Sequence, residues 1–409
     1  MESVTLEALP AEIKTAILYA ITDLASLNAV VHASPSFHAL YLSQRKQLLS
    51  TVLERCLQLP VMVDAVAALI ALRGWQERCK APKAALEAAD EFLSKYIPLR
   101  SMLAPPYSYS AYEHLDQELD VYQSFASLTE DDLIEMARLH TMVEFILKEM
   151  VHSFLELRPD TQKPKEENVA LSPPETFRMQ RALYRLEIYR LLFSTRGLPW
   201  FEEQDRLSDI YVNSDDQWNL FLSLFTPWEM EEIRCAAMNL KCDGANLVGL
   251  EIDDEHRENY VSLGLGFLYH SIHVSSITCR EERLLKQKAI LRGTLSRAVY
   301  FIVDALDTIP QYEYGWDFGD EGTDGKTFLS DADWNSPNLA WTWCLINSPH
   351  EDASIELWRD LSNPLRKWGF LFWDEHRLKE WSLSPEMIRE IQNSPVDKPS
   401  GRPYPFGWT

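Results

Sequence analysis

The chain has 409 residues and carries 62 Asp and Glu against 39 Lys and Arg, which gives a formal net charge of −23. This excess of carboxylates disfavours a general polyanion binder, because neutralising phosphates requires Lys and Arg to displace counterions. Hydrophobic residues make up 46% and charged residues 25%, both ordinary for a globular protein, while a total of only 14 glycines disfavours a glycine-rich nucleotide-binding fold.

Helix-start signals recur along the whole chain. Ser34 stands as an N-cap before a proline, and the segment from Ser172 to Glu175 combines the same arrangement with a capping-box glutamate. Thr129 and Thr226 open two further Thr-x-x-acid boxes. Alternating strand patterns are nearly absent, and the best candidate is 369–373. The sequence therefore predicts an all-α, multi-helix fold with at most a small β element near the C-terminus.

Periodic segments and irregular segments alternate along the chain. The expected helices include 130–157, 174–196, one that starts at 227, 256–273, 277–291 and 295–307. The expected organisation is an N-terminal helical unit (1–57), a helical domain (58–157), a polar linker or exposed loop (158–173), a C-terminal helical domain (174–392) and a tail (393–409). The C-terminal domain contains an acidic, aromatic loop at 310–337.

The six cysteines show no C-x2-C spacing, and Walker and G-x-G-x-x-G motifs are absent from the sequence. We therefore expect buried thiols in a reducing compartment, no metal and no cofactor. The N-terminus has an acid where a signal peptide needs bases, and no apolar run reaches the length of a membrane span. These features indicate a cytoplasmic or nuclear protein with no membrane and no DNA partner.

The N-terminal unit has a recognisable pattern. Residues 9–18 read Leu-Pro-Ala-Glu-Ile-Lys-Thr-Ala-Ile-Leu, residues 23–27 read Asp-Leu-Ala-Ser-Leu, and residues 34–37 read Ser-Pro-Ser-Phe. Over about 8–57 the chain resembles an F-box in the variant found in large families of filamentous-fungal proteins. Phe37 stands where the general F-box pattern has a late tryptophan, as is common in that variant.

This resemblance implies a three-helix unit that docks onto the adaptor subunit of a cullin–RING ubiquitin ligase. The residues at the positions that would contact the adaptor are Leu9, Pro10, Ile13, Ile17 and Leu18. The alternative is that they pack inside the protein, so that the unit is an F-box-like helical cap with no adaptor. Several segments between 172 and 381 also resemble the C-terminal regions of the same fungal families, which brings no established activity.

Two further patterns have charged side chains at regular spacing. Arg178, Arg181 and Arg185 lie on one face of the helix expected at 174–196, where they would either hold RNA phosphates or bridge carboxylates of the fold. The acidic loop would form either a solvated surface or a pocket for a cationic group through ion pairs and cation–π contacts. Its candidate pocket residues are Trp316, Asp317, Asp320, Glu321, Asp324 and Trp334.

These patterns leave competing functional hypotheses. In the first, the protein is an F-box-like interaction protein, a substrate-recruiting subunit of a cullin–RING ubiquitin ligase that brings in an unknown protein target. In the second, it has the general look of the arginine-containing cyclodipeptide synthases of fungal specialised metabolism. Such an enzyme takes aminoacyl groups from charged tRNA, which requires a basic stripe and a pocket for an arginyl side chain. In the third, it is a helical scaffold without catalysis.

The linker prediction has a direct test. Residues 158–173 contain Pro159 and Pro164 together with six charged side chains and have no apolar period, so limited proteolysis should cut there before any other internal site. The cut sites are read by mass spectrometry of the early fragments. A first cut inside 227–307 would contradict the predicted division.

Overall fold

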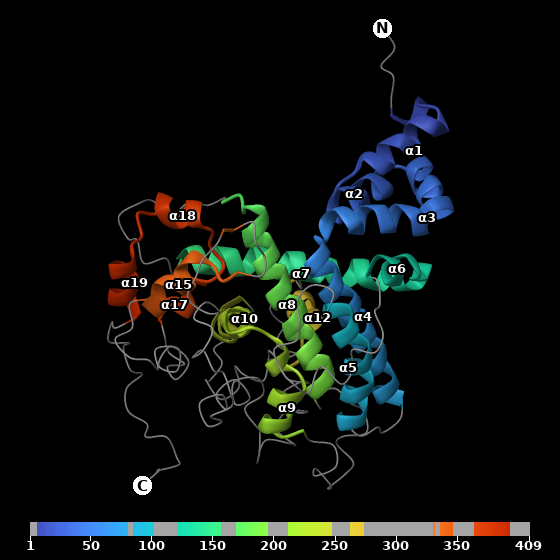
Figure 1. The fold of residues 1–409 in the computed structure, drawn as a ribbon. Coiled ribbons are helices and arrows are strands. Elements are labelled where there is room, and N and C mark those ends of the chain that lie inside the picture. Colours follow the sequence, from blue (N-terminus) through green and yellow to red (C-terminus); the bar gives the residue numbers. More distant parts are fainter. Residues whose placement is uncertain are drawn as a thin grey trace.

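The structure is a computed structural model that describes residues 6–80, 85–101, 121–156, 169–194, 212–247, 262–273, 330–331, 336–346 and 364–392. This described part consists of helices joined by turns and contains no strand, which confirms the all-α class predicted from the sequence. Figure 1 shows a small N-terminal group of helices that projects from a larger helical body, with the C-terminal helices on the opposite side of that body.

The N-terminal unit consists of a short 3-10 turn and three helices. These are η1 (Leu6–Ala8), α1 (Ala11–Ala20), α2 (Leu24–Ala33) and α3 (Pro35–Cys56). The Asp23 carboxylate caps α2 by accepting a hydrogen bond from Ser26 N at 2.8 Å, and Ser34 Oγ caps α3 by accepting one from Phe37 N at 3.3 Å. The Phe37 ring is buried in the core of the unit. The three helices that the F-box resemblance implies are therefore present.

The body is built around one central helix. Its first helices are α4 (Leu59–Lys80), α5 (Ala85–Ser101), α6 (Val121–Ala126), α7 (Glu130–Glu156) and α8 (Pro173–Phe193). Helix α8 contacts α4, α5, α7 and α10, and nearly all of its side chains are buried. A surface helix would keep a polar face in water, so burial all round identifies α8 as the core of the body.

The rest of the body consists mainly of shorter helices. They are α9 (Ser214–Leu220), η5 (Leu222–Leu224), α10 (Pro227–Leu247), α12 (Leu265–His273), α15 (Leu339–Ile346), α17 (Pro364–Lys367), α18 (Glu375–Glu380) and α19 (Pro385–Gln392). Helices α15, α17, α18 and α19 form the C-terminal side of the body in Figure 1. Buried side chains from before and after the predicted linker belong to one continuous hydrophobic core.

Three helices begin with the capping boxes expected from the sequence. In α8, Ser172 Oγ accepts a hydrogen bond from Glu175 N at 3.3 Å, and Glu175 Oε2 accepts one from Ser172 N at 2.9 Å. The same two hydrogen bonds join Thr226 and Glu229 at the start of α10, and Thr129 and Asp132 at the start of α7. Each box satisfies two backbone donors that the first turn of a helix leaves without partners.

The carboxylate that closes each box also forms an ion pair with an arginine from a distant segment. The three pairs are Asp132 with Arg73, Glu175 with Arg377, and Glu229 with Arg100. A carboxylate has about four acceptor positions, so it can hold the helix start and the arginine together. The start of each of these helices is therefore also a tertiary contact.

Residues 369–373, the strand candidate, lie at a turn instead. Gly369 has a φ of +63°, and a Cβ added there would lie 2.8 Å from the Phe154 ring, so this position requires glycine. Asn338 Nδ2 donates to the carbonyl oxygens of Phe370, Leu371 and Trp373 at 3.2, 2.8 and 3.2 Å. The apolar run is buried because it passes through the core as a turn held by one asparagine.

Helix α4 is the one described helix that is long and apolar enough to cross a membrane by length and composition. Most of that stretch is buried against α8, α5 and α7, so packing inside the body accounts for its apolar character. The helices expected at 277–291 and 295–307, the tail at 393–409 and residues 158–168 of the expected linker lie outside the described residues.

Candidate functional site

The five residues aligned with the F-box adaptor surface have different environments. Pro10 and Ile13 are exposed, Leu9 and Ile17 are half-buried, and Leu18 is buried in the core of the unit. Leu18 follows Lys14 by one helical turn on the inward face of α1, so it supports the fold of the unit. Leu18 therefore faces the core of the unit rather than its exposed surface.

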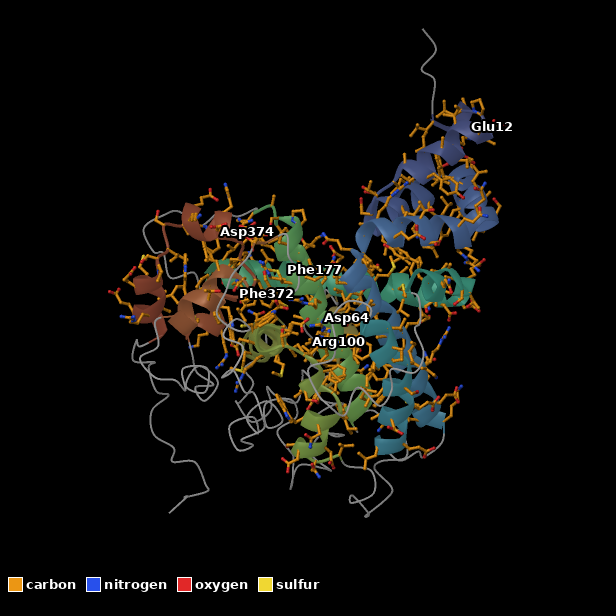
Figure 2. The ribbon with its side chains drawn as sticks, in the orientation of Figure 1. Glu12, Asp64, Arg100, Phe177, Phe372 and Asp374 are labelled. Atoms are coloured by element: carbon orange, nitrogen blue, oxygen red, sulfur yellow. The ribbon has the colours of Figure 1, made fainter. Side chains whose placement is uncertain are left out.

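Apolar side chains remain accessible at the start of the unit. They are the exposed Leu6, Pro10 and Ile13 and the half-buried Leu9, which we call the N-terminal apolar patch. Leu6 belongs to η1, which is held on α1 by a hydrogen bond from Lys14 Nζ to a backbone carbonyl oxygen at 2.8 Å. Glu12, beside the patch, lies at the outer end of the unit and away from the body in Figure 2.

The three arginines expected to form a basic stripe are not on the surface. Arg178, Arg181 and Arg185 are 4%, 2% and 3% exposed, so an RNA phosphate has no access to them. The sequence correctly places them on one face of a helix, but that face is packed against carboxylates from other segments of the chain. The bridging alternative is the one that the geometry supports.

Helices α4, α5, α8 and α10 meet at a buried ionic cluster in the middle of the body (Figure 2). We define it by six side chains: Asp64, Arg100, Arg181, Arg185, Glu229 and Glu232. Arg185 donates to Asp64 Oδ2 and Glu229 Oε1, both at 2.9 Å, and Arg181 Nη2 donates to Glu232 Oε1 at 2.6 Å. Arg100 Nη2 donates to Glu229 Oε2 at 2.9 Å.

The cluster also uses neutral groups. Tyr96 Oη donates to Asp64 Oδ1 at 2.7 Å, which leaves both oxygens of that carboxylate bonded. The guanidinium groups of Arg100 and Arg185 lie 4.7 and 4.5 Å from the centre of the Phe225 ring. These contacts offset part of the cost of removing charged groups from water.

The pKa values of the cluster carboxylates move in opposite directions. Although burial favours the neutral acid, the guanidinium groups of Arg100, Arg185 and Arg181 hold the pKa of Glu229 well below its usual value. Burial raises the pKa of Glu232, because Arg181 offsets it only in part and the charge of Glu229 adds to it. The same arginines thus favour the ionised form of Glu229, whereas at Glu232 the effect of Arg181 is smaller than that of burial.

The acidic loop has one described residue that tests its role. Asp331 pairs with Arg178 at 2.5 Å, and its second oxygen accepts a hydrogen bond from Glu375 N at 2.7 Å. An arginine of this chain thus takes the place of an external cation at this carboxylate. The candidate pocket residues of the loop all lie outside the described residues: Trp316, Asp317, Asp320, Glu321, Asp324 and Trp334.

The cysteines that can be assessed fit the expectation of structural thiols. Cys235 and Cys344 are buried, Cys56 and Cys79 are half-buried, and all four are free thiols. Burial raises the pKa of Cys56 to about 11, which keeps it protonated at neutral pH. In the described part of the chain, no three His, Cys, Asp or Glu side chains are grouped to hold a metal ion.

The buried ionic cluster therefore has a structural role, because each cation in it has a carboxylate partner and its side chains are closed to solvent. Within the described residues, the N-terminal apolar patch and a groove between α4 and α5 are open to an outside partner. Sequence reasoning missed the groove because its lining comes from four separate helical segments.

Comparison of the chain with models of protein families, with curated proteins and with solved structures found no match. The F-box resemblance therefore depends on the residues quoted above and on the three helices that they form.

The structural role of the cluster predicts the effect of removing one arginine. Arg181→Met leaves Glu232 buried without its partner and should lower the free energy of unfolding by about 3–5 kcal/mol at neutral pH. The matched control is Arg138→Met, whose exposed pair with Glu135 should contribute less than about 1 kcal/mol. Urea denaturation of both variants measures the two values.

The pH dependence of this loss has a defined sign. Without Arg181 the folded-state pKa of Glu232 is raised further above its unfolded value, so the neutral acid is favoured in the folded state at low pH. The loss in Arg181→Met should therefore be smaller at pH about 5 than at pH about 7. Equal losses at both pH values, or equal losses in the two variants, would contradict a structural ionic cluster.

Proposed function

We propose that the protein is an interaction protein whose N-terminal unit docks onto the adaptor subunit of a cullin–RING ubiquitin ligase. The observation that carries the proposal is the N-terminal apolar patch, which coincides with the Leu-Pro opening of the F-box-like segment. Exposed apolar side chains that adjoin one another in a soluble protein often mark a surface for another protein. The body would then hold the target that the ligase modifies.

The position of the unit supports this proposal. It projects from the body, and its α2 and α3 contact α7, so the patch at the start of α1 is left accessible (Figure 1). Arg45 of α3 forms an ion pair with Glu130 at the start of α7, which attaches the unit to the body on the side away from the patch. A partner on the patch would therefore leave the body unobstructed.

The alternative enzyme hypothesis has no support among the described residues. Its basic stripe is buried in ion pairs, and its cation pocket lies outside them. We therefore propose no tRNA-dependent chemistry.

A charge placed in the patch tests the proposal. Ile13 is 49% exposed, so Ile13→Asp should leave the fold intact while it weakens adaptor binding by at least about 2 kcal/mol, as expected for a central interface residue. Leu9→Asp combined with Pro10→Ala should have the same effect. Binding is measured by pull-down and by calorimetry with a purified adaptor subunit.

Leu86→Asp is the matched control, because Leu86 of α5 is 50% exposed and belongs to the body. It should bind the adaptor like the wild type. Wild-type protein that does not bind the adaptor, or Ile13→Asp protein that binds it unchanged, would rule out the proposal and leave the unit as a structural cap.

A further inference from the structure

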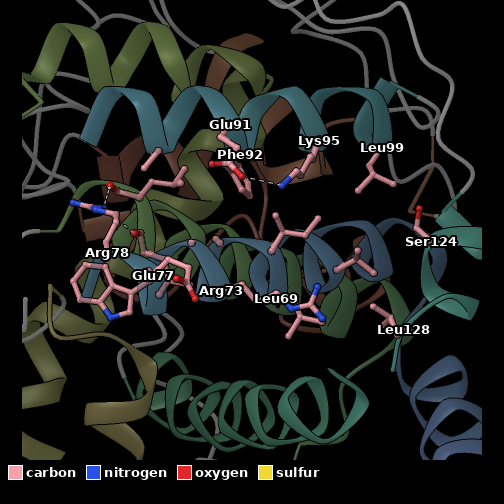
Figure 3. Close-up of a pocket in the computed structure, with 18 of the residues that line it drawn as sticks. Leu69, Arg73, Glu77, Arg78, Glu91, Phe92, Lys95, Leu99, Ser124 and Leu128 are labelled. Carbon is pink, nitrogen blue, oxygen red and sulfur yellow. Dashed lines mark hydrogen bonds and ion pairs between the residues drawn. The ribbon is translucent and has the colours of Figure 1, made fainter. Parts of the chain in front are cut away.

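A groove with a volume of about 460 Å³ runs between α4 and α5, and side chains of both helices point into it (Figure 3). Its lining is mainly apolar and comes from segments far apart in the chain. Representative residues are Ile70 of α4, Phe92 and Leu99 of α5, Leu128 after α6 and Leu192 at the end of α8. The volume and the apolar lining with a few polar groups are typical of small-molecule sites.

The groove follows α4 over several turns. Its lining along α4 extends from Val66 to Arg78, which corresponds to about 18 Å at 1.5 Å per residue. A single extended hydrocarbon chain can lie along this length with its methylene groups against the apolar lining.

The charges of the groove favour an anionic end on that chain. Three of its five charged lining residues are basic, although carboxylates outnumber basic side chains 62 to 39 in the whole chain. Arg73 and Lys95 lie on opposite walls and are half-exposed (Figure 3). Arg73 bonds Asp132 through Nη2 alone, and Lys95 Nζ reaches Glu91 Oε1 at 3.3 Å. Both side chains therefore keep N–H groups for a ligand.

We propose that this groove binds a single-chain aliphatic carboxylate. The hydrocarbon lies along the apolar lining, where burial of its methylene groups supplies the affinity. The carboxylate lies between Arg73 and Lys95, where hydrogen bonds from the two cations are charge-assisted. This site is separate from the N-terminal apolar patch, so the proposal of a ligand here does not depend on adaptor docking.

Substitution of Gly74 can block the groove while the fold stays intact. It lines the groove inside α4, and a Cβ added there would meet nothing within 4 Å. Gly74→Leu should fill the groove, while Gly74→Ala adds one methyl group and leaves the groove open. Both replace a glycine in a helix interior, so both should melt at or above the wild-type temperature.

The probes are laurate and dodecyltrimethylammonium, which have the same chain length and opposite charges, studied by calorimetry below their micelle concentrations. The full-length wild type and Gly74→Ala should bind laurate, and Gly74→Leu should not. Lys95→Gln should bind laurate roughly tenfold more weakly, because it loses a hydrogen bond between charged groups. Dodecyltrimethylammonium should bind all four proteins weakly or not at all.

Three results would overturn the proposal. They are no binding of laurate by the wild type, unchanged binding by Gly74→Leu, and equal binding of the two probes by the wild type. The last result would show that any amphiphile binds and that Arg73 and Lys95 have no role. Adaptor binding measured on Gly74→Leu should be unchanged, which keeps the two sites distinguishable.

Discussion

Charge compensation of the arginines inside α8 is the constraint on which the body depends. A buried guanidinium without a carboxylate partner costs several kcal/mol, so the helices around α8 are fixed where they supply that partner. Asp64 of α4 pairs with Arg185. In α10, Glu229 pairs with both Arg181 and Arg185, and Glu232 pairs with Arg181. The central helix can therefore be buried on every side although it is rich in charge.

The same chemistry couples local and long-range structure. Glu229 closes the capping box of α10 and pairs with Arg100 of α5, and Glu175 closes that of α8 and pairs with Arg377. Since one carboxylate serves both contacts, the helix start and the tertiary packing stabilise each other. Helix α4 has two roles in this arrangement, because one of its faces provides Asp64 to the cluster while another lines the groove at Gly74.

Local signals predicted the all-α class and the starts of three helices, but they carry no information on partners distant in sequence. The Ser-x-x-Glu and Thr-x-x-acid boxes placed the starts of α7, α8 and α10, because a capping box needs only neighbouring residues. Helical spacing put the three α8 arginines on one face but gave no information on whether carboxylates or water cover it. The burial of Leu18 depends on the rotation of α1 against its neighbours, which a resemblance in sequence does not give. The groove needs four segments brought together, and no single one shows it.

A double-mutant cycle between Arg185 and Asp64 tests the central claim most directly. The free energies of unfolding of Arg185→Met, Asp64→Asn and the double variant are compared with that of the wild type by urea denaturation. If the pair fixes α4 on α8, the two single losses should each be large, and their sum should exceed the loss in the double variant by at least about 1.5 kcal/mol. Losses that add to within about 0.5 kcal/mol would show that the two side chains contribute independently, and would contradict the account.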